Sequence, residues 1–113
     1  MPRNMSFFIT TDQIRNKTKT VTRRLGWKFL KLGDIINACV KCQGLKKGEK
    51  VEKICQIKVL SIRWGEPLYR VTQEDCILEG FPEMTPDDFI DMFVRHNKVW
   101  AMCPVNRIEF EYI

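Results

Sequence analysis

The sequence lacks any apolar run near the roughly 20 residues that a membrane-spanning helix needs. Its N-terminus also lacks the long apolar core of a secretory signal. Apolar residues make up 44% of the chain and charged residues 29%, a balance that favours neither a disordered segment nor a fibrous repeat. We therefore expect a cytoplasmic protein, cytosolic or nuclear, without a membrane partner.

Histidine is nearly absent, and cysteine occurs in an odd number. The five cysteines are Cys39, Cys42, Cys55, Cys76 and Cys103, and the one histidine is His96. Cys39 and Cys42 form a CxxC pair, but a structural zinc site needs a second ligand pair at matching spacing. We expect reduced cysteines, a surface histidine, and neither a metal nor another cofactor.

Acidic residues are outnumbered by basic ones. The chain has 19 Lys and Arg against 14 Asp and Glu, which gives a net charge of +5 and a pI of about 9.1. This balance favours polyanionic partners, with nucleic acid as the leading candidate. A length of 113 residues suffices for one core and is too short for two, so we expect a single domain spanning residues 1–113.

The apolar pattern predicts a β-rich chain. Short apolar or β-branched runs indicate strands at 5–10, 20–24, 35–40 and 54–63, and a strict period of two indicates a closing strand at 105–113. The polar tract 44–53 is predicted to be a solvated hairpin loop that joins two antiparallel strands. In the closing strand, Ile108, Phe110 and Tyr112 share one face, and Arg107, Glu109 and Glu111 share the other.

Helix signals fall at three places. Thr11 and Asp12 predict a short turn that ends at a left-handed Asn16. Thr72 is a predicted N-cap whose helix stops at Gly80, and Thr85 followed by Pro86 opens another helix. The second of these places its apolar face at Phe89, Ile90, Phe93 and Val94. Together the elements predict an α+β fold, with helices around a small sheet or barrel.

The stretch 16–34, NKTKTVTRRLGWKFLKLGD, is the most informative segment of the chain. It holds six cations and five threonine, asparagine or tryptophan residues, with Asp34 as its one carboxylate. Such a composition indicates recognition of an anion. Trp27 within it, and Trp64 elsewhere, are candidates for stacking on bases, although tryptophan is more commonly a packing residue.

Three motifs in order resemble the ASCH domain, a PUA-like family associated with RNA: KTVTRR at 19–24, LGD at 32–34 and TQEDCILEGF at 72–81. The closing segment NRIEFEYI is similar to the last strand of phage and bacterial members. The resemblance covers most of the chain. It implies a small mixed or antiparallel PUA-like β-barrel with two or three decorating helices, and a cleft that binds RNA or a nucleoside.

The resemblance also implies site residues. Small bacterial members deacetylate N-acetylated cytidine with a Lys, a Thr and a Glu, which fall here on Lys19, Thr22 and Glu79. Arg23, Arg24, Lys17 and Trp27 are the corresponding candidates for contacts to nucleic acid. The family usually has glycine where this chain has Lys17, so we expect Asn16 to take the left-handed conformation instead.

The residues themselves leave several functions open. A threonine hydroxyl needs a base, and a lysine can serve when burial or neighbouring cations lower its pKa. In a regular strand, however, Lys19 and Thr22 would point to opposite faces, so a joint site requires irregular backbone between them. Glu79 near a helix C-terminus is unfavourable and predicts a cationic partner such as Lys19 or Arg24. The alternatives are a non-catalytic RNA-binding module, a ribonuclease and a protein-binding regulator.

Overall fold

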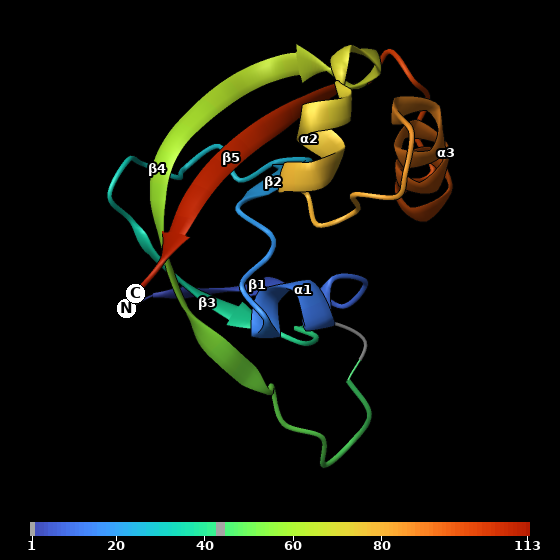
Figure 1. Ribbon diagram of the computed structural model, residues 1–113. Coiled ribbons are helices and arrows are strands. Elements are labelled where there is room, and N and C mark those ends of the chain that lie inside the picture. Colours follow the sequence, from blue (N-terminus) through green and yellow to red (C-terminus); the bar gives the residue numbers. More distant parts are fainter. Residues whose placement is uncertain (1, 43–44) are drawn as a thin grey trace.

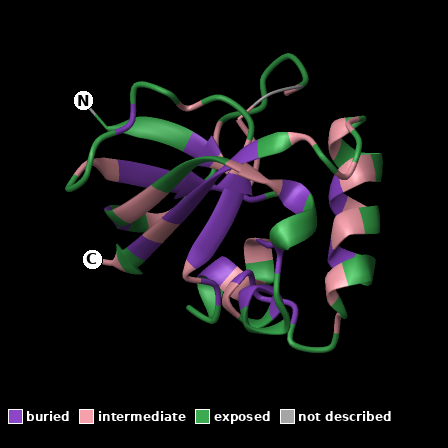
Figure 2. Ribbon diagram, turned by 90° about the horizontal axis from the view of Figure 1, so that it is seen from above, coloured by how far each residue is buried: buried purple, intermediate pink, exposed green. Residues whose placement is uncertain are grey.

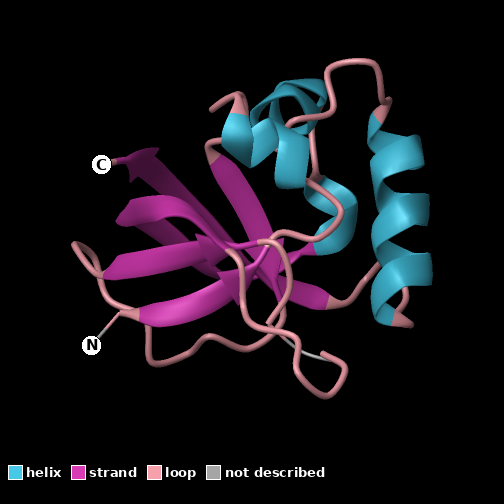
Figure 3. Ribbon diagram, turned by 90° about the horizontal axis from the view of Figure 1, so that it is seen from below, coloured by secondary structure: helices cyan, strands magenta, loops and turns pink. Residues whose placement is uncertain are grey.

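The fold is a strongly curved sheet with the two later helices together at one end, while the short first helix lies apart from them (Figure 1, Figure 3). The computed structural model describes residues 2–42 and 45–113. Its strands are β1 (Arg3–Ser6), β2 (Val21–Arg24), β3 (Ile35–Cys39), β4 (Lys53–Pro67) and β5 (Pro104–Tyr112). Its helices are α1 (Thr11–Arg15), α2 (Gln73–Leu78) and α3 (Pro86–Asn97), with a 3-10 turn at Leu68–Arg70. This order matches the α+β pattern predicted from the sequence.

The sheet has five strands in the order β1-β3-β4-β5-β2. β1 pairs with β3 in parallel, and the remaining pairs are antiparallel, including β3 with β4 as predicted. The long strands β4 and β5 carry the curvature, so the sheet forms a half-barrel. β1 and β2 are its two edges, and the space between these edges is the setting of the site described below.

The core consists of two buried clusters. The concave side of the half-barrel holds Met5, Phe7, Ile14, Leu30, Ile36, Ala38, Ile57, Val59, Ile108 and Phe110. The second cluster packs α2 and α3 against the ends of β4 and β5, through Leu68, Val71, Cys76, Phe81, Phe89, Phe93 and Val105. In Figure 2 the buried residues of α3 face the sheet and its exposed residues face away.

Capping explains where α2 and α3 begin. Thr72 accepts a hydrogen bond from the Asp75 N–H, and the Asp75 carboxylate accepts one from the Thr72 N–H, which completes a capping box. Thr85 and Asp88 form the same arrangement, with Pro86 in the first turn of α3. Both starts were predicted from the sequence and are confirmed.

Several predicted boundaries were wrong. The first strand is Arg3–Ser6 rather than 5–10, because the apolar residues after Phe7 form a turn in which Phe8 is 63% exposed. The left-handed residue after α1 is Lys17, with φ 62°, and not Asn16, whose φ is −92°. β4 begins at Lys53 and continues to Pro67, beyond the predicted 54–63. Of the predicted loop 44–53, Gly44 lies outside the described residues.

Candidate functional site

A cleft of about 470 Å³ opens where the edge strands β1 and β2 leave the half-barrel unclosed. Its size falls within the range of ligand-binding pockets, about 300–1,000 Å³. The predicted residues Lys19, Thr22, Arg23, Arg24, Trp27 and Glu79 all line it. Lys17 does not line it, and its side chain is exposed.

Lys19 and Glu79 form a buried pair in this cleft. The Lys19 ammonium donates to Glu79 Oε1 at 2.6 Å and to the Glu79 main-chain carbonyl at 2.9 Å. Each side chain is 3% exposed. Glu79 is the C-cap of α2, where a carboxylate is unfavourable because it lies at the negative end of the helix dipole. Lys19 offsets this charge and donates a hydrogen bond to a main-chain carbonyl that has no partner within the helix.

Lys19 lies outside the regular strand β2, and both Lys19 and Thr22 line the cleft. Lys19 precedes β2, and the left-handed Lys17 turns the chain before it. The Thr20 N–H donates to the Leu78 carbonyl at 2.9 Å, and the Tyr112 hydroxyl donates to the Lys19 carbonyl at 2.5 Å. The alternation of a regular strand therefore begins only after Lys19.

Arg23 is enclosed by carboxylates. Its guanidinium contacts Glu79 Oε2 at 3.0 Å and Asp75 Oδ2 at 3.0 Å, and it lies 3.8 Å from Glu66. Its side chain is only 2% exposed. Arg107 continues the series by contacting Asp75 at 3.4 Å.

We call these six side chains the buried ion network: Lys19, Arg23, Glu66, Asp75, Glu79 and Arg107. Three cations balance three anions within it. Arg107 was predicted on the face opposite Ile108 and Phe110, and on that face it contacts Asp75 of α2 and is buried. The network places Arg23 inside the structure as a partner of Glu79, so its position suits holding that carboxylate better than contacting a phosphate.

Burial decides the direction of the pKa shift of Lys19 but not that of Asp75. It lowers the pKa of Lys19 in spite of the attraction of Glu79, and the nearby charges of Arg24 and Arg23 lower it further. Burial alone would raise the pKa of Asp75, but the hydrogen bond from the Thr72 N–H and the charge of Arg23 outweigh it, so this pKa is lowered. Lys19 is thus brought toward the neutral form, which a general base requires.

Arg24 is the cation that is best placed to meet a ligand. It donates from Nε to Thr22 Oγ1 at 3.0 Å and from Nη2 to the Ser6 carbonyl at 2.6 Å, and its guanidinium lies 4.7 Å from the Phe7 ring centroid. Among the described residues, no carboxylate lies within 4.0 Å of it. Desolvation lowers its pKa to about 10, which still leaves it charged at neutral pH.

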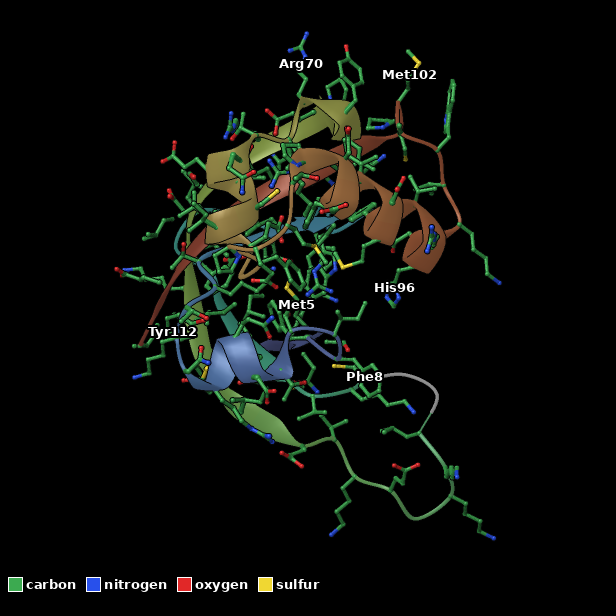
Figure 4. The ribbon with its side chains drawn as sticks, turned by 45° about the vertical axis from the view of Figure 1, so that its right-hand side comes forward. Met5, Phe8, Arg70, His96, Met102 and Tyr112 are labelled. Atoms are coloured by element: carbon green, nitrogen blue, oxygen red, sulfur yellow. The ribbon has the colours of Figure 1, made fainter. Side chains whose placement is uncertain are left out.

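Apolar side chains form the opposite wall and the mouth of the cleft. Phe81, Phe89 and Phe93 come from the second core cluster. Phe8, on the turn after β1, and His96, on α3, lie on either side of the opening (Figure 4). Both side chains are exposed, so His96 is a surface residue as predicted, although its place at this cleft was missed.

Sequence reasoning also missed Asp75 and Arg107. A signal for Asp75 was available, because the third residue of a capping box is fixed in place by its helix start. Arg107 carried no comparable signal, since a charged residue in an alternating strand is normally solvated.

Residues 2–42 and 45–113 contain all five cysteines and the one histidine. All five cysteines are free thiols. No group of three or more His, Cys, Asp or Glu side chains in this part of the chain is arranged to hold a metal ion. No helix within it is long and apolar enough to cross a membrane.

Comparisons with known proteins show a shared fold but not a function. No family model matches the sequence, and no curated protein matches it. Among solved structures, the hypothetical protein PH0355 is similar over 100% of both chains, with a TM-score of 0.67 and 21% identity. Protein EF3133 from Enterococcus faecalis V583, of family DUF984, is similar over 100% of this chain and 76% of its own, with a TM-score of 0.59 and 13% identity. At these identities the likeness shows a shared half-barrel fold with helices at one end.

Proposed function

We propose that this chain is an ASCH-type, PUA-like protein that binds RNA or a modified nucleoside in the cleft and hydrolyses an N-acylated cytidine there. The observation that carries the proposal is the buried Lys19–Glu79 pair, which opens onto the same cleft as Thr22 and Arg24. A lysine brought toward neutrality that lines the same cleft as a hydroxyl supplies the two groups that hydroxyl activation requires.

The proposed reaction uses Thr22 as the nucleophile. Lys19 takes the proton from Thr22 Oγ1, and this oxygen adds to the acyl carbonyl. The bond from carbon to nitrogen then breaks, and the departing amine takes the proton from Lys19. Water attacks the resulting threonine ester in the same manner, which releases the carboxylic acid and restores the hydroxyl.

Arg24 and Glu79 support these steps. The Arg24 Nε–H bond to Thr22 Oγ1 stabilises negative charge as it develops on that oxygen. Glu79 positions Lys19 Nζ through one carboxylate oxygen, while Arg23 holds the other oxygen. Trp27 and the phenylalanine wall offer apolar surface to the base of the ligand.

A non-catalytic RNA-binding module is the second candidate. It is favoured by the cations Arg24 and Lys41, which line the cleft without a carboxylate partner among the described residues. Binding of this kind would weaken steeply with salt, because phosphate contacts release counterions.

Turnover of N-acetylated cytidine, followed by chromatography of the released cytidine, tests the proposal. We expect Lys19→Met to lower the rate by roughly 10²–10⁴-fold, the usual contribution of a general base. Thr22→Val should abolish turnover, and Thr22→Ser should retain part of it. The matched control is Lys17→Met, which removes a nearby exposed lysine and should stay within about twofold of the parent.

Two outcomes would contradict the reaction. Equal turnover by Lys19→Met and Lys17→Met would remove Lys19 from the chemistry. Absence of turnover by the parent protein, together with salt-sensitive RNA binding, would assign the cleft to the non-catalytic module.

A further inference from the structure

A second hollow, of about 580 Å³, lies next to the cleft and is lined by Gly26, Lys28, Trp64, Gly65, Pro104 and Asn106. The chain between 25 and 28 separates the two spaces. Leu25 and Trp27 line the cleft, whereas Gly26 and Lys28 line the second hollow. Because four residues span at most about 14 Å, the two spaces are close neighbours.

Trp64 is placed in this hollow by an irregularity of β4. The register against β5 shifts between Arg63, which faces Arg107, and Glu66, which faces Val105, so that Trp64 and Gly65 together oppose Asn106. Two residues opposite one define a β-bulge, a device that redirects a side chain and is frequent beside active sites. Trp64 is 49% exposed, although packing would bury such a side chain more fully.

Asn106 fixes the floor of the hollow. It is 8% exposed, and its amide oxygen accepts from the Gly65 N–H at 3.1 Å. Its amide nitrogen donates to the Gly26 carbonyl. On the other side, Asn106 pairs with Arg24 of β2, so one strand position connects the Trp64 bulge, the dividing segment and the cleft cation.

We infer that the second hollow is a subsite for a neighbouring nucleotide of single-stranded RNA, whose base stacks on Trp64 while its phosphate meets Lys28. An exposed indole beside a lysine is the combination used for single strands, since every base has a face for stacking and every nucleotide carries a phosphate. Because the second hollow adjoins the cleft, we expect it to hold the nucleotide next to the one that binds in the cleft. This inference rests on the proposed function and deepens it: the substrate is an RNA strand rather than a free nucleoside.

The test compares binding of a short single-stranded oligoribonucleotide, by fluorescence anisotropy, with binding of the mononucleoside, by calorimetry. We expect Trp64→Ala to weaken binding of the oligonucleotide about 5- to 150-fold, which corresponds to roughly 1–3 kcal/mol for one stacked base. Binding of the mononucleoside should stay within about twofold of the parent. Lys28→Ala should reduce the slope of log affinity against log salt by about one.

Trp100→Ala is the matched control, because Trp100 is 67% exposed and lies outside the residues that line the two spaces. It should leave both affinities unchanged. Thermal melting of each variant checks that the fold is intact, and Trp64→Phe provides a milder change that keeps an aromatic face.

The outcomes separate the subsite from the proposed function. Equal oligonucleotide affinity for Trp64→Ala and Trp100→Ala, with nucleoside binding by the parent, would overturn the subsite and leave the proposed function standing. Binding of neither ligand by the parent would overturn both. Self-association of the parent that Trp64→Ala abolishes, seen by sedimentation, would assign this face to a second copy of the chain and also overturn the subsite.

Discussion

Removal of Arg23 should destabilise the protein far more than removal of an exposed arginine. Arg23→Met leaves Glu79, Asp75 and Glu66 without their shared cation, within a site where the arginine side chain is 2% exposed. Breaking a buried ion pair by deleting one partner costs about 3–5 kcal/mol, because the remaining charge stays buried. For 113 residues the entropy of unfolding is about 240 cal/mol/K, so the melting temperature should fall by roughly 13–21 °C.

Arg15→Met is the matched control for this experiment. Arg15 pairs with Glu52 at the surface, where the two side chains are 52% and 63% exposed. Exposed pairs contribute about 0–1 kcal/mol, so this variant should melt within a few degrees of the parent. Differential scanning calorimetry on the three proteins measures the comparison. Similar losses for Arg23→Met and Arg15→Met would refute the reasoning.

The pH dependence gives a second criterion for the Arg23 variant. In the parent, the lowered pKa of Asp75 contributes stability above its unfolded value of about 3.9, and this stability is lost as the pH falls through the folded value. Without Arg23 the pKa of Asp75 should rise, because burial is then opposed only by the Thr72 hydrogen bonds and the longer contact with Arg107. The folded variant then takes up protons more readily than the parent, so its deficit should be smaller at pH 4.5 than at pH 7. An equal deficit at both values would count against buried charge as the cause.

Two further predictions concern residues next to Lys19. In urea denaturation, Gly80→Ala should destabilise the protein by more than Gly33→Ala. Both glycines have positive φ, but of the two only an added Cβ at Gly80 would meet a side chain, with Gln13 Cγ at 2.7 Å. Equal losses of stability would show that Gln13 moves aside freely. Tyr112→Phe should remove a tyrosine whose partly buried hydroxyl has its pKa raised to about 12 by desolvation, and it should cost about 1 kcal/mol through the lost bond to the Lys19 carbonyl. An unchanged ultraviolet titration above pH 11 would contradict the assignment.

Local patterns predicted the elements whose causes are local. The capping boxes at Thr72 and Thr85 and the alternation in β5 each depend on residues within a few positions of one another. The strand predicted over 5–10 was wrong because apolar side chains can line a cleft as well as a buried strand. Phe8 and Ile9 continue the apolar pattern of a buried strand, yet both are exposed, and both line the cleft.

The candidate site was only partly predictable for a related reason. A resemblance to a family pointed to Lys19, Thr22 and Glu79, and the helix dipole indicated that Glu79 needs a cation. The partners are 60 residues apart for Lys19 and 56 for Arg23, so no local rule could choose between Arg23 and Arg24. Arg107 became buried only because α2 returns to that side of the sheet.

The hydrogen bond from Arg24 to the Ser6 carbonyl also bears on how the protein resists aggregation. An open half-barrel leaves two strand margins with unpaired main-chain groups, and such margins invite a strand from another molecule to add on. Here Arg24 of β2 donates a hydrogen bond to the main-chain carbonyl of Ser6, on the opposite edge strand β1. Arg24 therefore does two jobs: it keeps the opening accessible to a small ligand while denying it to a foreign strand, and loss of this arginine should favour aggregation as well as weaken binding.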